Sequence, residues 1–102
     1  MFGNNQTLKF TVDEPFTNRS RLGIIYQILQ ICHNDQISQT QLMYKANLSY
    51  FQLKKYVNTL LTKDLLQETI HDGKKSYCST PRGRQFIEAF RDLTVLLGNS
   101  QH

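Results

Sequence analysis

Residues 38–80 read SQTQLMYKANLSYFQLKKYVNTLLTKDLLQETIHDGKKSYCST, and two serines in this stretch each precede a glutamine by three positions. The pairs are Ser38 with Gln41 and Ser49 with Gln52. In such a pair the serine oxygen accepts from the backbone N–H of the glutamine, whose side chain accepts from the backbone N–H of the serine. Both pairs therefore predict helix N-termini, one directly after each serine.

The connection between these two helices is short. The first is expected over residues 39–46 and the second over residues 50–62, with only Asn47 and Leu48 before the second cap. Two helices joined by so tight a turn form a helix-turn-helix. On the second helix, apolar residues recur at helical spacing and predict its buried face. They are Leu53, Val57, Leu60 and Leu61.

A hairpin is expected directly after the second helix. Residues 65–71 and 76–79 have strand-forming side chains, and residues 72–75, DGKK, lie between them. Asp-Gly is a preferred dipeptide for a hairpin turn. The sequence therefore predicts a mainly α (α+β) fold, a winged helix-turn-helix with a three-helix core and a two-stranded β wing.

One further helix is expected on each side of this unit. Residues 19–33 have so wide an apolar face that this helix should contact two other elements, one of them the C-terminal helix. Asn34 is expected to end it in the left-handed conformation. Thr80 as N-cap and Pro81 as first helical residue predict the start of the last helix, which should run to about Leu97.

These signals divide the chain into three parts. Residues 1–17 form an N-terminal arm in which residues 7–12 alternate between polar and apolar side chains. Alternation is typical of an edge strand, and a frayed tail is the other interpretation. Residues 18–80 are expected to form the winged helix-turn-helix domain, and residues 81–98 the C-terminal helix.

Basic residues gather on the helix-turn-helix and the wing. The chain of 102 residues carries a formal charge of +4, and residues 45–84 hold eight lysines and arginines against three acids. A positive surface of this kind suits a polyanion such as a nucleic acid.

Other classes of function find little support. No apolar run is long enough to cross a membrane and the first residues lack a secretion signal, so we expect a cytoplasmic protein without a membrane partner. Cys32 and Cys78, with His33 and His71, match no common zinc or redox pattern. Because no catalytic motif or phosphate-binding loop is present either, we expect no enzyme, no metal site and no cofactor.

The outward face of the helix over 50–62 is the expected DNA reader. The major groove admits one α-helix, in which lysine can reach guanine, asparagine and glutamine can pair with adenine, and Phe51 can pack on a thymine methyl. The preceding helix and the wing should hold the phosphate backbone. The alternative is a merely solvated face. The predicted DNA-binding residues are Ser38, Gln39, Thr40, Tyr44, Lys45, Ser49, Tyr50, Phe51, Gln52, Lys54, Lys55, Asn58, Lys74 and Lys75.

The last helix carries a seam of apolar residues: Phe86, Phe90, Leu93 and Leu97. Such spacing occurs in coiled coils and also where a helix packs on its own domain. The first and last helices together have more apolar side chains than a three-helix core of this size needs. We therefore expect a two-fold homodimer in which the seams of two last helices pair.

Three segments of the chain resemble the archaeal ArnR-like winged-helix family: RSRLGIIYQIL (19–29), SQTQLMYKANLSYFQLKKYVNTLLTKDLL (38–66) and YCSTPRGRQFIEAF (77–90). Its members are small DNA-binding proteins, some of which dimerise through a C-terminal antiparallel coiled coil. The resemblance implies a winged-helix fold, duplex DNA as the partner and a homodimer.

The resemblance also bears on single residues. It implies that Lys54 and Lys55 face DNA, and that Thr80 and Gly83 build the start of the last helix. Phe51 departs from the family pattern, which typically has a polar or basic residue there. The last helix is also shorter than the coiled-coil arm of the best-known members.

The sequence therefore predicts a sequence-specific, double-stranded DNA-binding transcriptional regulator that acts as a homodimer. The helix over 50–62 should enter the major groove, and wing residues 72–75 should contact the backbone. Two other functions stay open. One is a weakly specific architectural protein of the chromatin type, and the other is a protein-interaction module anchored by Phe51 and Tyr50.

Overall fold

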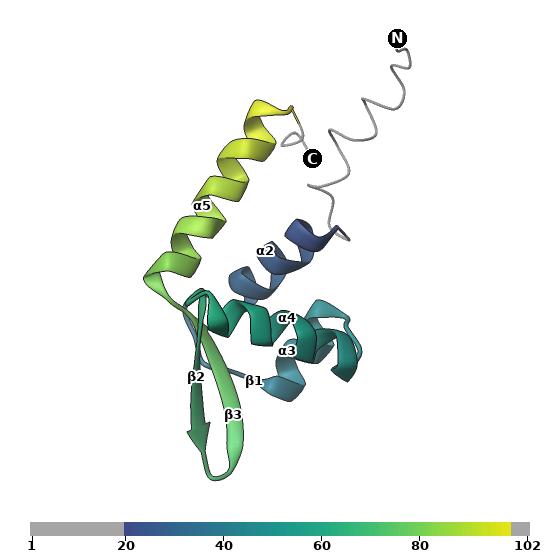
Figure 1. The fold of residues 1–102 in the computed structure, drawn as a ribbon, viewed down its shortest axis with the longest axis vertical. Helices are drawn as coiled ribbons and strands as arrows, with labels where there is room; N and C mark the ends of the chain where they lie inside the picture. Colours follow the sequence, from purple (N-terminus) through teal and green to yellow (C-terminus); the bar gives the residue numbers. More distant parts are fainter. Residues whose placement is uncertain (1–19, 99–102) are drawn as a thin grey trace.

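The computed structural model describes residues 20–98, so the arm predicted over residues 1–17 lies outside the described residues. Four helices and a three-stranded antiparallel sheet make up the described part. They are α2 (Arg21–Ile31), β1 (Ile37–Ser38), α3 (Gln39–Ala46), α4 (Tyr50–Thr62), β2 (Leu66–His71), β3 (Lys74–Ser79) and α5 (Pro81–Leu96). The β2–β3 hairpin extends from one side of the helices and α5 from the other (Figure 1). The predicted mainly α winged helix-turn-helix is confirmed.

Polar caps set where α3 and α4 begin, as predicted. Ser38 Oγ accepts from the Gln41 N–H at 3.1 Å, and Ser49 Oγ accepts from the Gln52 N–H at 3.1 Å. Between the helices Asn47 takes the left-handed conformation, with φ 57°. This one residue ends α3 and turns the chain into α4.

The first helix is shorter than predicted at both ends. Ser20 is its N-cap, and the Ser20 hydroxyl accepts from the Gly23 N–H at 3.0 Å. At the other end Cys32 caps the helix with φ −93°. Asn34 is not among the described residues with positive φ, so the left-handed cap predicted there is wrong.

The sheet has one strand more than predicted. β1 pairs antiparallel with β3, Ile37 lying opposite Tyr77, and the strand order is β1-β3-β2. Two residues are too few to show an alternation, so no sequence pattern marks this strand.

The turn of the wing is tighter than predicted. Asp72 and Gly73, with φ 53° and 75°, form it alone, and β3 already begins at Lys74. Two consecutive positive φ angles are typical of a two-residue hairpin turn, for which Asp-Gly is suited. The predicted four-residue turn over 72–75 is therefore wrong.

One hydrophobic core joins the helices to the sheet. Its fully buried side chains are Ile28, Leu29, Cys32, Leu42, Leu53 and Leu60. The stacked rings of Tyr26 and Phe90, with centroids 4.4 Å apart, connect α2 to α5, as the apolar width of the first helix predicted. Within residues 20–98 no helix is long and apolar enough to cross a membrane.

The start of α5 is fixed to the end of α4. Thr80 Oγ1 accepts from the Gly83 N–H at 2.9 Å and donates to the Asp64 carbonyl at 2.7 Å. A Cβ on Gly83 would collide with the carbonyl oxygen of Leu65. The first turn of α5 therefore packs directly on backbone, and only glycine fits there.

Candidate nucleic-acid interface

The outward face of α4 presents the side chains predicted to read DNA. Four exposed residues form it: Phe51, Lys54, Lys55 and Asn58. Phe51 leaves 79% of its surface exposed, although it is a large apolar residue. On the opposite side of the helix Leu53, Val57 and Leu60 are buried in the core. The core thus holds α4 rigidly and leaves the outward face available to a partner.

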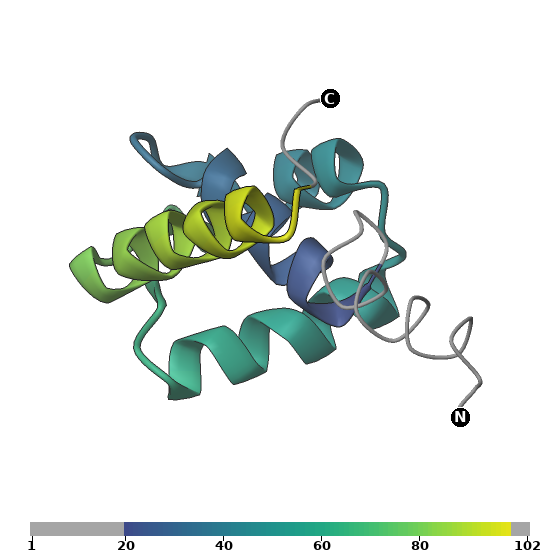
Figure 2. The same ribbon diagram turned by 90° about the horizontal axis from the view of Figure 1, so that it is seen from above.

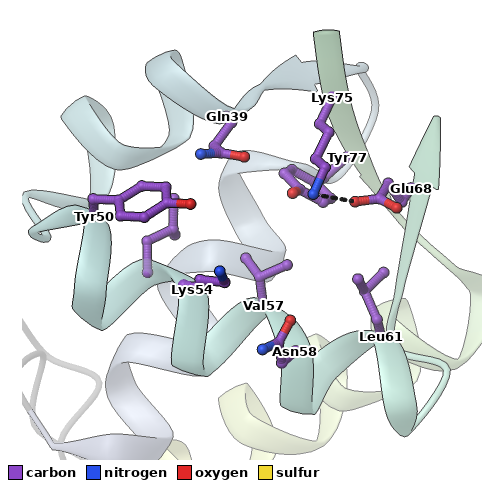
Figure 3. A pocket seen from close by; sticks show the side chains of 10 residues that line it. Gln39, Tyr50, Lys54, Val57, Asn58, Leu61, Glu68, Lys75 and Tyr77 are labelled. Carbon is purple, nitrogen blue, oxygen red and sulfur yellow. Dashed lines mark ion pairs between the residues drawn. The ribbon is translucent and has the colours of Figure 1, made fainter. Parts of the chain in front are cut away.

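Lys54 and Lys55 lie at the two edges of this outward face, because successive helical residues are about 100° apart. Lys54 lines a hollow between α4 and the wing (Figure 3). Lys55 lines a groove between α4 and the start of α2. The two adjacent lysines therefore meet different parts of any partner that covers the helix.

The hollow between α4 and the wing combines aromatic, amide and charged side chains. Tyr50 and Lys54 from α4, Gln39 from α3, and Lys75 and Tyr77 from β3 surround it (Figure 3). Lys54 Nζ lies 5.8 Å from the centre of the Tyr50 ring, within the range of a cation–π contact. A cavity of about 40 Å³ is far smaller than a usual small-molecule site, so the hollow suits the edge of a larger partner.

Glu68 belongs to this hollow and was not predicted. Its carboxylate lies 3.9 Å from Lys75 Nζ, and 29% of its side chain is exposed. Glu68 is directly opposite Tyr77 in the β2–β3 ladder. Burial raises the pKa of Tyr77 to about 12, and the negative charge of Glu68 adds to the rise. A phosphate that approaches Lys75 must therefore compete with Glu68.

The two wing lysines point to different sides. Both belong to β3 and are adjacent, and adjacent strand residues face opposite surfaces of a sheet. Lys75 shares the α4-facing side with Glu68 (Figure 3). Lys74, opposite His71 in the ladder, lies on the other side. They are thus two separate contacts and not one basic tip.

The remaining predicted residues surround these groups. Thr40, Tyr44, Lys45, Ser49 and Gln52 are exposed, whereas Ser38 and Gln39 are partly buried. Three of these seven side chains, those of Ser38, Ser49 and Gln52, are engaged in helix caps. Neither α3 nor α4 has an acidic residue in its first turn, so the positive end of each helix dipole is free to attract an anion.

The predicted seam of α5 is divided between core and surface. Phe90 is buried, and Phe86 is partly buried with its ring 6.2 Å from that of Phe90. Leu93 and Leu97 are 45% and 38% exposed. The first half of the seam thus holds α5 on its own domain, and the second half leaves apolar surface at the far end of the helix.

The two cysteines are free, Cys32 buried and Cys78 half-buried. Burial raises the pKa of the Cys32 thiol to about 12, with a further contribution from Cys78, so this thiol stays protonated at neutral pH. Within residues 20–98 no group of three or more histidines, cysteines or acids is arranged to hold a metal ion.

Two capped helices with a left-handed turn between them, followed by a tight hairpin, are the parts of a known family. Residues 18–97 match the family model described as winged helix-turn-helix. The chain belongs to this winged helix-turn-helix family. Two similar proteins come from Methanocaldococcus jannaschii. The uncharacterized protein MJ0290 is 30% identical over 83 residues, which are 81% of this chain and 37% of the relative. The uncharacterized protein MJ0287 is 31% identical over 81 residues, which are 79% of each chain. This winged helix-turn-helix chain thus spans little more than a third of the first relative.

Solved structures share the winged helix-turn-helix fold. Sso10a-2, a DNA-binding protein from Sulfolobus solfataricus, has a TM-score of 0.72 at 22% identity. The match covers 79% of this chain and 84% of the Sso10a-2 chain. The transcriptional regulator BldR from the same organism has a TM-score of 0.70 at 19% identity, covering 97% and 84%. MepR of S. aureus, in a DNA complex, has a TM-score of 0.66 at 16% identity, covering 96% and 82%. The fold is therefore one that DNA-binding transcription regulators use.

Proposed function

We propose that the chain is a sequence-specific, double-stranded DNA-binding transcriptional regulator that acts as a homodimer and belongs to the archaeal ArnR-like group. Residues 18–80 bind DNA, with α4 in the major groove and the wing on the phosphate backbone. The observation that carries the proposal is the outward face of α4, where exposed Phe51 and Asn58 lie between lysines on both flanks.

The chemistry of this face supports sequence reading. Asn58 has the amide that pairs with the major-groove edge of adenine, and Phe51 suits the methyl group of thymine. Lysines on the flanks suit the phosphates that border a major groove. A helix with apolar and amide groups in the middle and cations at the sides therefore complements a duplex better than a single strand.

The far end of α5 supports the homodimer. Leu93, Leu96 and Leu97 are exposed in this chain, and pairing with a second copy would bury them. Residues 81–98 are thus the proposed dimerisation element. A two-fold dimer places its α4 helices on half-sites about one duplex turn apart.

Fluorescence anisotropy with a labelled random-sequence duplex, repeated over a salt series, tests DNA binding. We expect affinity to fall steeply with salt, because each phosphate contact adds about 0.9 to the slope of log affinity against log salt. No binding at low salt would contradict the proposal.

Sequence specificity has a separate test. Selection from a random duplex library should yield a consensus, and Phe51→Ala with Asn58→Ala should relax it. Thr62→Ala, an exposed change near the end of the same helix, is the matched control. Equal affinity of the unaltered protein for all duplexes would favour a weakly specific architectural protein instead.

The exposure of two aromatic rings favours one other function. Phe51 and Tyr50 are 79% and 52% exposed, and rings of this kind anchor protein partners. A protein-interaction module would bind no duplex at low salt and would lose its partner on Phe51→Ala.

A further inference from the structure

A groove lies on the side of α4 that faces away from the wing. It has a volume of about 460 Å³, and its described lining is Arg21, Ile25, Gln52, Lys55, Tyr56 and Thr59. Two of these residues are cations and none is an acid. Figure 2 shows the start of α2, in dark blue, beside the teal N-terminal half of α4. Arg21 and Lys55 thus come from two helices that are far apart in sequence and meet along one groove.

Arg21 occupies a position that is unfavourable for its own helix. It is the first residue of α2, where the positive end of the helix dipole repels a cation. Its side chain is exposed, and α2 has no acidic residue in its first turn to offset the charge. The first turn of α2 therefore gives the Arg21 charge no stabilising partner, and the exposed guanidinium is available to an anion.

The arrangement of α4 between its two flanks indicates which anion. α2 and the wing lie on opposite sides of α4 (Figure 1). A helix with its side chains is about as wide as the major groove, so a helix in the groove has one phosphate backbone on each flank. The wing-side hollow carries Lys54 and Lys75 together with Glu68, whereas the described residues of the α2-side groove include two cations and no acid.

We infer that Arg21 and Lys55 bind phosphates of the DNA strand that borders the major groove on the side away from the wing. This inference rests on the proposed function and adds to it Arg21, a residue that no sequence pattern marks as DNA-binding. Gln52 and Thr59 complete the polar rim of the groove, while Ile25 and Tyr56 form its apolar floor.

The test compares Arg21→Ala, Arg21→Lys and Lys55→Ala with the unaltered chain, by anisotropy over a salt series. We expect each alanine variant to weaken binding to every duplex alike and to lower the salt slope by about one unit, because one phosphate contact is lost. Arg21→Lys, which keeps the charge, should retain the slope. Arg82→Ala on α5, an exposed arginine whose Nε donates to the Lys63 carbonyl, is the matched control and should change nothing.

Two outcomes would overturn the inference. The first is an unchanged slope in Arg21→Ala, and the second is an equal loss in Arg21→Lys, which would indicate packing rather than charge.

The failure of this inference is distinguishable from the failure of the proposed function. If the unaltered chain binds no duplex at low salt, the proposed function falls and the inference falls with it. If the unaltered chain binds with a steep salt slope that Arg21→Ala does not alter, only the inference falls. The thermal unfolding temperature of Arg21→Ala should not be lower than that of the unaltered chain, since the variant removes an unfavourable charge from the helix start.

Discussion

Among single residues, Glu68 places a negative charge within the positively charged surface formed by α4 and the wing. Because the Glu68 carboxylate lies 3.9 Å from Lys75 Nζ, a DNA phosphate must compete with Glu68 for this lysine. We expect Glu68→Gln to raise affinity for all duplexes several-fold and to increase the salt slope by up to one unit. Anisotropy over a salt series measures both, and Glu88→Gln on α5 removes the same charge at an exposed position elsewhere. Unchanged binding in Glu68→Gln would show that Lys75 does not contact DNA.

Phe51 allows a second test at the scale of one methyl group. If its exposed ring packs on thymine, replacing the contacted thymine with uracil in a selected duplex removes the methyl and weakens binding. Burial of one such group is worth roughly 0.8 kcal/mol, or about fourfold in affinity. Phe51→Ala should bind both duplexes equally. If Phe51→Ala discriminates between them as the unaltered protein does, another residue contacts the methyl.

Helix and strand boundaries were predictable from the sequence wherever one or two residues determine the local backbone geometry. The capping hydrogen bonds of Ser38 and Ser49 set where two helices start, and the Asp72-Gly73 pair sets the hairpin turn. β1 was not predictable, because its two residues are strand only by pairing with β3. Asn34 has the chemistry of a left-handed cap, but the helix ends earlier at Ile31.

The candidate site was predictable in part for the same reason. Helical spacing identified the exposed face of α4, since that face depends on one element. Glu68 depends on register: a two-residue turn places it opposite Tyr77, whereas the four-residue turn expected from the sequence does not. Arg21 depends on the packing of α2 beside α4, which no local pattern contains.

The joint between α4 and α5 yields a prediction about an element. Gly83 packs against the Leu65 carbonyl with no room for a Cβ. We expect Gly83→Ala to lower the free energy of unfolding by about 1–3 kcal/mol, the usual cost of overpacking, although alanine favours helix. Urea denaturation measures the change. Gln85→Ala, at an exposed position two residues further along the same helix, should leave stability nearly unchanged, and an equally stable Gly83→Ala would mean that the joint can open.

For the whole molecule, two buried groups predict how stability depends on pH. Both Cys32 and Tyr77 have a pKa raised to about 12 from ordinary values of 9.0 and 10.0. The folded state thus favours their neutral forms, so their contribution is complete below about pH 9 and is lost as pH rises toward 12. Urea midpoints between pH 8 and 11.5 should fall, and fall less in Tyr77→Phe. Identical pH profiles for Tyr77→Phe and the unaltered chain would contradict a raised Tyr77 pKa.

Self-association is the other prediction for the whole molecule. Leu93→Asp with Leu97→Asp should convert a dimer to a monomer of nearly unchanged fold, because both side chains are already exposed in one chain. Val95→Asp, exposed on another side of α5, is the matched control. Sedimentation equilibrium at micromolar concentration distinguishes the two states. A monomeric unaltered chain would contradict the homodimer.

The contact of Gly83 with the Leu65 backbone finally has a consequence for the spacing between the two half-sites that a dimer would bind on DNA. A helix fixed at its start to the end of α4 cannot pivot freely, so a dimer joined at the far ends of two α5 helices would hold its two reading helices at one separation. Such a dimer would tolerate changes of base at the centre of its operator better than the insertion of a single base pair. The number of base pairs between the two half-sites would then matter more for binding than which bases they are.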